Sequence, residues 1–382
     1  MKILIVTGIF EPEVGGPAVY VPKLATRLCE MGNTVSVLTY SSIQSGAFDS
    51  GYAFALVRLV RGNKIVNRVR MFLAAYRLAR GADVVYLLDW FAAGQPAALA
   101  SRLRGIPYVV RVGGDYLWEQ RYIESNEPPV SLGDFYARDM HLKPSYAPYL
   151  RIMRSLLRKA AHVVFNSQKQ RELYVHHYGV LQEKSSVICN PVPEQAGQGS
   201  ERSQPSKEFV FWGRFIRVKN LDSLIRAFAK ANLPHGFTLT LIGNGPQGAM
   251  LKKLVESLGL EERVRFEPAM SLTLILERVR NARAAVIPSW SDIAPNQVFE
   301  ALSIGLPALV TSENYLPIRA ELPMMVDPRY VEDIAAKLEI LSDDDRYADF
   351  SKRFSSISFH HTWDDVAKAH MDIFDTVVKQ PD

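Results

Sequence analysis

The stretch AAVIPSWSDIAPNQVFEALSIGLP, residues 284–307, joins a short apolar run to a helical pattern through an acidic loop. The run AAVIP has the length and character of a buried strand, and Pro295 suits the first turn of the helix that follows. Seven residues separate two acids, Asp292 in the loop and Glu300 in the helix. A strand that leads directly into a helix is the repeating unit of a parallel α/β sheet. This stretch therefore predicts an α/β fold.

The same unit recurs along the chain. Continuous apolar runs that alternate with helical patterns indicate parallel strands covered on both faces. In the first half the runs are KILIVTGIF (2–10), TVSVLTY (34–40), FALVRLV (54–60), VVYLLD (84–89), YVVRVGG (108–114), HVVFNS (162–167) and VICNPV (187–192). In the second half they are FVFWGR (209–214), TLTLIGNG (238–245), RVRFEPA (263–269), AAVIPSW (284–290), ALVTSE (308–313) and PMMVDP (323–328). The helices expected between them include Pro17–Met31, Val66–Arg80, Leu150–Ala161, Leu221–Ala231 and Gly248–Leu258.

A segment without hydrophobic periodicity divides the chain. Residues 194–208, EQAGQGSERSQPSKE, are rich in Gly, Ser, Gln and charge, which is typical of a linker. We therefore expect two tandem Rossmann-like, doubly wound parallel-sheet domains, residues 1–194 and 206–360, facing a central cleft. The pattern over Trp363–Val378 predicts a terminal amphipathic helix, within residues 363–382, that packs back on the first domain.

The composition indicates a globular protein with a mildly basic surface. Of 382 residues, 48% are hydrophobic and 22% charged, and the net charge of +5 suggests an acidic ligand or an anionic surface. Cys29 and Cys189 lack metal-ligand spacing, so we expect reduced thiols in a cytoplasmic protein. No segment reaches the roughly 18 uninterrupted apolar residues of a membrane span. The N-terminal MKILIVTGIF is expected to be a buried strand and not a leader, because Glu11-Pro12-Glu13 follows it.

Glycine-rich turns follow two of the predicted strands. Gly15-Gly16 precedes Pro17 after the first strand, and an exposed helix start there would favour an anion. The turn at residues 243–245, GNG, is one that a nucleotide could approach closely. An ordinary strand-to-helix turn is the alternative at both places. Because the first turn is not GxGxxG, the dinucleotide fingerprint is absent there.

Basic residues follow the first strand of the second domain. In FWGRFIRVKN, Gly213 allows a sharp turn, and Arg214 and Lys219 come soon after the strand. A guanidinium fork and an ammonium that project into one cleft suit a diphosphate. A solvated basic loop is the alternative.

The acids of residues 284–307 suit the two ends of a nucleotide-sugar. The helix start after Pro295 would point the N–H groups of residues 296–298 into the cleft, where their partial positive charge would hold phosphate. Glu300 and Asp292 could each accept hydrogen bonds from sugar hydroxyls. The spacing therefore predicts a ligand with a hydroxylated ring at each end and a diphosphate between them.

Taken in order, these motifs resemble those of the family-4 retaining glycosyltransferases of the GT-B type, the glycosyl transferases group 1. The similarity covers nearly the whole chain: Gly-Gly after the first strand, Gly-Arg followed by Lys-Asn, GNGP, and acid-x7-acid followed by EALSIGLP. The resemblance implies that Arg214 and Lys219 hold the donor diphosphate. It also implies that Glu300 binds the nucleotide ribose and that Asp292 contacts the transferred sugar.

Two departures from the family pattern matter. The first acid is usually Glu before a Gly-containing loop, whereas Asp292 precedes Ile-Ala-Pro-Asn, so the identity of the donor sugar is not carried over. Where the family often has a His after the fifth strand, RVGGDYLWEQR offers Asp115 and Glu119. We expect Asp115 to reach the cleft from the first domain and to act on the sugar or the acceptor hydroxyl. A helix cap is the alternative role.

These arguments define the predicted site. The predicted catalytic residues are Asp115, Asp292, Arg214 and Lys219. The predicted donor-binding residues are Gly15, Gly16, Gly213, Arg214, Lys219, Gly243, Asn244, Gly245, Asp292, Ala294, Pro295, Asn296, Gln297 and Glu300. No metal is predicted, because the histidines lack ligand spacing and Asp343 and Asp345, in LSDDDR, suit a helix cap.

The resemblance implies a retaining enzyme that moves a sugar from a nucleotide-diphosphate-sugar to a growing surface glycan or its lipid carrier. We expect no cofactor beyond this co-substrate and no nucleic-acid partner. Two alternatives stay open. A nucleotide-sugar epimerase shares the fold but should need a His among the acids around the sugar, and this chain lacks it. A catalytically inactive subunit would bind the nucleotide-sugar but would not show even slow hydrolysis of it.

A basic segment suggests a membrane as a further partner. From Arg58 to Arg80 the chain has seven Lys or Arg residues and no acid, and LRIMRSLLRKAAH, from Leu150, adds four more bases. A basic amphipathic helix can lie on an anionic membrane, which would place the protein peripherally at the inner face of the cell membrane. A solvated helix face is the alternative.

Overall fold

The computed structural model describes residues 1–13, 15–44, 49–89, 91–123, 127, 129–137, 146–193 and 205–379. The chain divides into two compact units. The first unit comprises Met1–Asp115, Leu142–Asn190 and His361–Asp382, and the second comprises Tyr116–His141 and Pro191–His360. The predicted domain end at 194 and most of the predicted linker lie outside the described residues.

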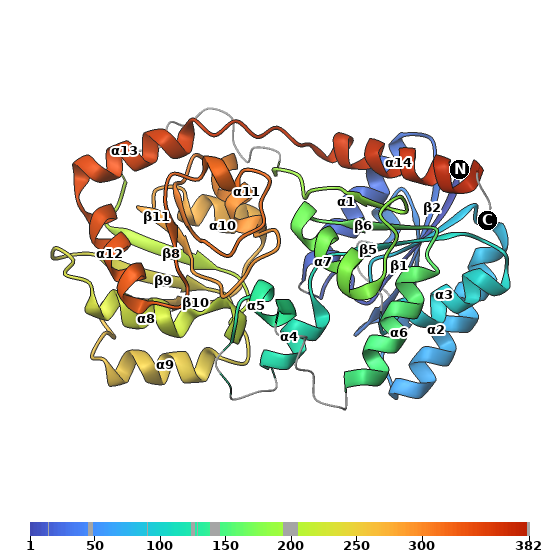
Figure 1. Ribbon diagram of the computed structural model, residues 1–382, viewed down its shortest axis with the longest axis horizontal. Helices are drawn as coiled ribbons and strands as arrows, with labels where there is room; N and C mark the ends of the chain where they lie inside the picture. The colour runs from blue at the N-terminus through green and yellow to red at the C-terminus, as the bar shows by residue number, and fades with distance from the viewer. Residues whose placement is uncertain are drawn as a thin grey trace. The chain divides into compact units, whose positions relative to one another are not determined.

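The first unit, whose strands β1, β2, β5 and β6 are labelled in Figure 1, is built on a parallel sheet. The sheet has seven strands in the order β3-β2-β1-β4-β5-β6-β7. Its strands are β1 (Lys2–Thr7), β2 (Thr34–Ser41), β3 (Ala55–Val60), β4 (Val84–Leu87), β5 (Tyr108–Val112), β6 (His162–Phe165) and β7 (Ser185–Val187). Its helices are α1 (Gly16–Glu30), α2 (Lys64–Leu78), α3 (Gly94–Leu103), α6 (Ala147–Arg158), α7 (Gln168–Tyr178) and α14 (Trp363–Lys379).

Helices cover both faces of this sheet, because its strands are apolar on both sides. On one face α1 and α14 pack against each other and against the alternate strand residues Ile3, Ile5 and Tyr86. Figure 1 shows α2, α3 and α6 on the other side of the same sheet. The terminal helix thus belongs to the first unit, although it follows the whole second sheet in the chain.

The second unit holds a six-stranded parallel sheet with the order β10-β9-β8-β11-β12-β13. Its strands are β8 (Glu208–Trp212), β9 (Thr238–Ile242), β10 (Val264–Glu267), β11 (Ala284–Ile287), β12 (Ala308–Thr311) and β13 (Met325–Val326). Its helices are α4 (Tyr116–Ile123), α5 (Leu132–Ala137), α8 (Leu221–Lys230), α9 (Gly248–Ser257), α10 (Leu272–Val279), α11 (Asn296–Ser303), α12 (Val331–Ser342) and α13 (Asp344–Ser355).

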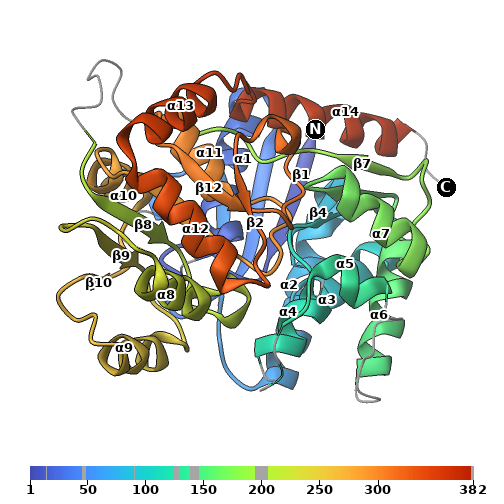
Figure 2. The ribbon, with the colours of Figure 1, turned by 60° about the vertical axis from the view of Figure 1, so that its left-hand side comes forward.

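Two apolar clusters sandwich the second sheet. Phe209 and Phe211 of β8 face the cluster with α8, α9 and α12, whereas Val210 and Trp212 face the cluster with α10 and α11. Figure 2 shows α8 and α12 together beside β8 and β9. In both sheets the first strand lies between the second and the fourth, so each sheet has a topological switch point at which ligands bind in open α/β folds. The prediction of two doubly wound parallel-sheet domains is confirmed.

The segment that follows β5 differs from the sequence-based division. Helices α4 and α5 follow a strand of the first unit, yet they group with the second unit, where α4 contacts the turn Arg217–Lys219. The backbone N–H of Leu132 donates to Ser291 Oγ at 2.8 Å, in the loop before α11. Leu117, Trp118 and Phe135 are buried. This packing joins sequence-distant segments, so a boundary drawn from composition does not show it.

Two smaller expectations concern cysteines and membrane spans. Cys29 and Cys189 are free thiols, as expected, and both are half-buried. In the part of the chain that the structure describes, no helix combines the length and hydropathy that crossing a membrane requires.

Candidate active site at the switch point of the second sheet

Two glycine turns pack backbone to backbone beside the switch point. Gly213 has φ 140°, and its N–H donates to the Ile242 carbonyl at 2.9 Å. A Cβ on Gly243, where φ is 147°, would lie 2.0 Å from the Gly213 carbonyl oxygen. A Cβ on Gly245 would lie 2.5 Å from the Phe215 carbonyl oxygen. The contact between the two turns therefore accounts for these glycines whether or not a nucleotide also approaches them.

The turn also holds Asn244, whose carbonyl oxygen accepts a hydrogen bond from the Phe215 N–H at 2.7 Å. The side chain of Asn244 is exposed. The role in donor binding predicted for residues 243–245 stays a prediction.

Lys219 and Asp292 meet in an ion pair. Lys219 ends the 3₁₀ turn Arg217–Lys219 after β8, and its Nζ lies 2.5 Å from Asp292 Oδ2. Ser289 Oγ donates to the same carboxylate oxygen at 3.1 Å. The two charged side chains are 18% and 13% exposed, so the pair is partly shielded from water. The sequence predicts that Lys219 binds the diphosphate of the donor and that Asp292 contacts its sugar. The structure places these two side chains in direct contact.

Backbone contacts fix the loop that carries Asp292. Its N–H donates to the Glu313 carbonyl at 2.9 Å, and its carbonyl accepts from the Tyr315 N–H at 3.2 Å. Asn220, buried and left-handed with φ 59°, donates from Nδ2 to the carbonyls of Pro288 at 3.1 Å and Pro328 at 2.9 Å. Asn220 therefore ties the loop after β11 to the turn that presents Lys219. The sequence-based site omitted Asn220, although the Lys-Asn pair was visible in FWGRFIRVKN.

The start of α11 joins the same site. Pro295 is the N-cap and not a residue of the first turn, and it accepts the Val298 N–H at 3.0 Å. The expectation that the N–H groups of residues 296–298 all point into a cleft is therefore wrong for Val298. Its amide bonds within the first turn instead. Asn296 is exposed, and Ala294 is half-buried beside Pro295.

Two side chains of α11 form hydrogen bonds with Trp212 at the end of β8. Gln297 Nε2 donates to the Trp212 carbonyl at 2.9 Å, and Trp212 Nε1 donates to Glu300 Oε2 at 2.5 Å. The indole therefore orients one carboxylate oxygen of Glu300. Sequence reasoning missed Trp212, although it precedes the Gly-Arg motif directly and lies at the carboxyl end of a central strand.

Arg214 is the most open of the predicted catalytic residues. Its side chain is 55% exposed, and Nη2 lies 3.8 Å from Glu119 Oε2 of α4. An exposed pair at this distance contributes little to stability. The guanidinium of Arg214 is therefore available to an anion that displaces Glu119.

Asp115 lies in the first unit and is buried. Only 1% of the residue is exposed, and Tyr174 donates its hydroxyl to Asp115 Oδ2 at 3.0 Å. This burial differs from the open, cleft-facing position that the sequence predicts. The physical reason is that the Tyr174 hydroxyl compensates a carboxylate removed from water. Its catalytic role stays a prediction.

The first unit has polar groups at its own switch point. Gly15, in extended conformation, precedes α1, and Gly16 begins that helix with no atom within 4 Å of the place a Cβ would occupy. Asp89, which follows β4, accepts the N–H groups of Phe91 at 2.7 Å and Ala92 at 2.9 Å. Burial raises the pKa of the Asp89 carboxyl. Its place two residues after the strand VVYL was a signal that the sequence-based site left unused.

The two acids of the DxD pattern lie at a helix start. Asp343 is the N-cap of α13, and its Oδ1 accepts the Arg346 N–H at 3.0 Å. The interpretation as a cap is confirmed for Asp343. Metal independence of the reaction stays a prediction.

Family models match both halves of the chain. Residues 14–196 match the model described as Glycosyltransferase Family 4, and residues 194–356 match the model described as Glycosyl transferases group 1. A D-inositol 3-phosphate glycosyltransferase of Catenulispora acidiphila is 24% identical over 86% of this chain and 83% of that protein. An exopolysaccharide phosphotransferase of Streptomyces coelicolor is 26% identical over 58% of this chain, and the chain spans only 24% of its length.

Solved structures share the fold. Anabaena HepE in complex with UDP is 18% identical, covers all of both chains and gives a TM-score of 0.70. Sucrose-phosphate synthase of Thermosynechococcus elongatus is 17% identical over 99% of both chains, with a TM-score of 0.72. These likenesses confirm the predicted GT-B architecture of two Rossmann-like units. Because family models match both halves of the chain, it belongs to the group 1 glycosyltransferases of family 4 and is a transferase of glycosyl groups.

Proposed function

We propose that the protein is a retaining glycosyltransferase that moves a sugar from a nucleotide-diphosphate-sugar to an acceptor glycan or lipid-linked saccharide in cell-surface polysaccharide synthesis. The observation that carries this proposal is the meeting of Lys219, Asp292 and the start of α11 at one switch point. The complex of the similar HepE with UDP supports a nucleotide-sugar as the donor.

In this proposal Lys219 and Arg214 hold the donor diphosphate and stabilise its charge as the bond from the sugar to the diphosphate breaks. The partial positive charge at the start of α11 adds to theirs. Asp292 accepts hydrogen bonds from the transferred sugar, and Glu300, oriented by Trp212, accepts those of the nucleotide ribose. The acceptor hydroxyl forms the new bond and passes its proton to Asp115 or to a donor phosphate oxygen. No metal enters this scheme.

The acceptor sets where the enzyme works. A growing glycan or a sugar on a lipid carrier would keep a cytoplasmic enzyme at the inner face of the cell membrane. The basic and apolar surface of the first unit supports this location.

A panel of nucleotide-sugars tests the proposal. A donor that binds only the folded protein raises its melting temperature, and the donor so identified is then incubated without acceptor. We expect slow hydrolysis that first releases the sugar in the donor's own anomeric configuration, followed by NMR, and that persists in chelator. Release of the opposite anomer would contradict retention. Binding without hydrolysis would indicate an inactive subunit, and interconversion of donor epimers would indicate an epimerase.

A further inference from the structure

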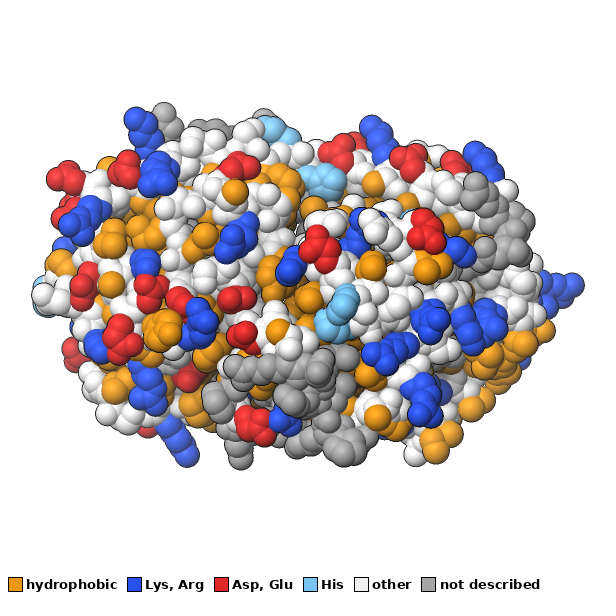
Figure 3. Space-filling view, in the orientation of Figure 1, with side chains coloured by type: hydrophobic (Ala, Val, Ile, Leu, Met, Phe, Trp, Pro, Cys, Tyr) orange, Lys and Arg blue, Asp and Glu red, His pale blue; other side chains and the backbone are white. Residues whose placement is uncertain are grey.

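Three helices of the first unit carry a surface that is basic and apolar at once. Helices α2, α3 and α6, all of whose residues are described, contain no Asp or Glu. They make up 37 of the 382 residues but hold eight of the fifteen large hydrophobic side chains that are exposed among the described residues. These eight are Ile65, Val66, Val69, Leu73, Leu99, Leu103, Tyr149 and Ile152. Figure 3 shows basic and hydrophobic side chains gathered over α2 and α6, at its lower right.

A groove of about 640 Å³ lies among these helices. Its apolar lining comes from Val69 and Phe72 of α2, Leu99 of α3, and Ile152 and Leu156 of α6. Val69, Leu99 and Ile152 are 53%, 50% and 41% exposed. Apolar side chains this open, side by side on three elements, form a patch that water solvates poorly.

Bases border the same groove. Arg68, Arg102, Arg151 and Lys159 line it together with the apolar residues. In the described part of the chain, no carboxylate forms an ion pair with Arg102, Arg151 or Lys159. Among the described residues, therefore, no ion pair neutralises the positive charge of Arg102, Arg151 and Lys159.

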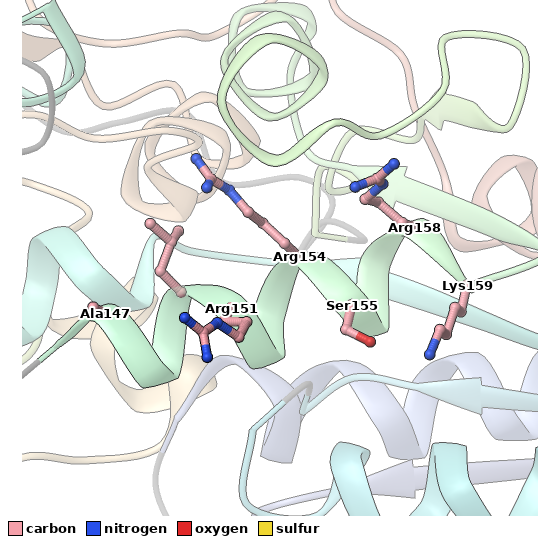
Figure 4. A pocket seen from close by; sticks show the side chains of 7 residues that line it. Ala147, Arg151, Arg154, Ser155, Arg158 and Lys159 are labelled. Atoms are coloured by element: carbon pink, nitrogen blue, oxygen red, sulfur yellow. The ribbon is translucent and has the colours of Figure 1, made fainter.

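The polar side chains of α6 and of Lys159, which follows it, point in two directions. In Figure 4, Arg151, Ser155 and Lys159 leave one side of the helix, and Arg154 and Arg158 leave the other. Arg154 Nη2 donates to the His177 carbonyl at 2.8 Å, so this base is engaged with α7. Arg151, Ser155 and Lys159 line both the groove and the adjoining hollow on α6. Their i, i+4, i+8 spacing gives one continuous polar edge beside the apolar lining.

This combination favours one class of partner. A solvated helix face normally mixes both signs of charge and keeps large apolar side chains singly dispersed. A polyanion such as RNA would satisfy the bases but would leave the apolar ridge in water. An anionic lipid surface satisfies both, because phosphates meet the bases while the apolar side chains enter the boundary between head groups and acyl chains.

We propose that α2, α3 and α6 form a docking surface for an anionic bilayer, with lipid phosphates held by Arg102, Arg151 and Lys159 and the apolar groove in contact with lipid chains. This inference rests on the proposed function for its setting, a membrane-borne acceptor. It assigns the contact to one face of the first unit, and it can be tested without any sugar transfer.

Flotation with vesicles tests the proposal. The vesicles contain phosphatidylcholine alone or mixed with phosphatidylglycerol, at low and high salt. The full chain should float with the mixed vesicles at low salt and be released at high salt, because surface attraction is screened. Each base removed should weaken partitioning about fivefold. The triple variant Arg102→Gln/Arg151→Gln/Lys159→Gln should therefore bind about 10²-fold more weakly.

Matched variants separate this surface from general charge and hydropathy. Arg226→Gln/Lys253→Gln/Lys352→Gln removes three exposed bases from the second unit and should bind as the wild type does. Val69→Ser/Leu99→Ser/Ile152→Ser should weaken binding about tenfold or more. Its control, Met250→Ser/Leu258→Ser/Leu274→Ser, changes exposed apolar residues of the second unit and should not weaken it.

The outcomes decide the proposal separately from the enzyme activity. Failure of the wild type to float at low salt would overturn it, and so would equal losses in the test and control variants. RNA binding as tight as vesicle binding, and unaffected by the apolar change, would replace the lipid with a nucleic acid. Donor hydrolysis in solution should be unchanged in all four variants. Absence of donor hydrolysis in the wild type would count against the proposed function but not against the docking surface.

Discussion

The ion pair between Lys219 and Asp292 joins a cation predicted for the diphosphate and an acid predicted for the sugar. Lys219→Met removes the charge but keeps most of the side chain's length. Because Asp292 is 13% exposed, losing its partner should lower the free energy of unfolding by about 1.5–3 kcal/mol. The double variant Lys219→Met/Asp292→Asn removes both charges and should recover most of that stability. Its turnover should stay about 10²-fold below the wild type, because the donor still lacks both partners.

Denaturant unfolding and donor hydrolysis are measured on the wild type, Lys219→Met and the double variant. Together they separate the effect on stability from the effect on turnover. A double variant that is both stable and fully active would show that the pair is only structural. Arg214→Ala serves as the comparison, because its exposed contact with Glu119 contributes little to folding. It should lower turnover without moving the melting temperature.

The burial of Asp115 makes Asp115→Asn a discriminating change. The Asn oxygen can still accept the Tyr174 hydroxyl, so the free energy of unfolding should fall by no more than about 1 kcal/mol. If Asp115 carries the predicted acid–base role, turnover should fall by roughly 10²-fold or more. Tyr174→Phe removes the donated hydrogen bond but keeps the carboxylate, and it should retain most activity. A fully active Asp115→Asn enzyme would point to Glu119 or the donor phosphate as the proton acceptor.

Single residues show where sequence reasoning ends. The types of Lys219, Asp292 and Glu300 and their places after strands were legible, because the carboxyl ends of parallel strands meet at one sheet edge. Their partners were not, since the contacts with Ser289 and Trp212 depend on side-chain direction. The glycines of residues 243–245 were read as space for a ligand, whereas the neighbouring turn fills that space.

Among the elements, α14 shows how one buried histidine links a helix to the sheet beneath it. His370 is fully buried, with Nε2 2.6 Å from the Tyr86 hydroxyl and Nδ1 2.6 Å from the Val366 carbonyl. Burial, helped by the positive charge of Arg111, lowers the pKa of His370 to about 3. The ring is therefore neutral in the folded protein at any pH near neutrality.

This shift predicts a dependence of stability on pH. In the unfolded chain His370 titrates near pH 6.5, so between about pH 6 and pH 3 the unfolded state binds a proton that the folded state does not. The free energy of unfolding should therefore fall as pH falls, by up to about 1.4 kcal/mol per pH unit from this residue. His370→Gln stays neutral throughout and should flatten that part of the slope. His162, with its pKa lowered to about 4 by burial, should keep its own contribution.

Denaturant unfolding between pH 7.5 and pH 4.5 measures the slope. The same substitution at the exposed His176, His176→Gln, serves as the comparison. Equal slopes for the wild type and His370→Gln would mean that α14 tolerates the charged ring.

Most elements could be predicted because each satisfies a local rule. All thirteen strands found among the described residues overlap an apolar run in the sequence. Helices α1, α2, α6, α8 and α9 lie within a few residues of the predicted helices. The strand β7 ends where its run VICNPV begins, since only Ser185–Val187 pairs with β6. The placement of α4 and α5 was not predictable, because contacts such as Leu132 with Ser291 span residues far apart in the chain.

At the scale of the whole molecule, the predicted donor-binding set divides between the two units. Gly15 and Gly16 belong to the first unit, and all the others, from Gly213 to Glu300, belong to the second. If the donor contacts both units, a change confined to the first should weaken its binding. If the second unit suffices, Gly15 and Gly16 serve only the local turn at the start of α1.

Gly16→Ala distinguishes these cases. A Cβ at Gly16 would meet no atom within 4 Å, and alanine favours the helix that begins there. The free energy of unfolding should therefore stay level or rise by up to about 1 kcal/mol. A donor whose phosphate approaches this backbone closely would meet the new methyl group, and kcat/KM should then fall about tenfold or more. Gly81→Ala, also in open space in the first unit, controls for general effects of the substitution. Unchanged kcat/KM in Gly16→Ala would show that the donor does not approach this backbone closely and would leave Gly16 a purely structural role at the start of α1.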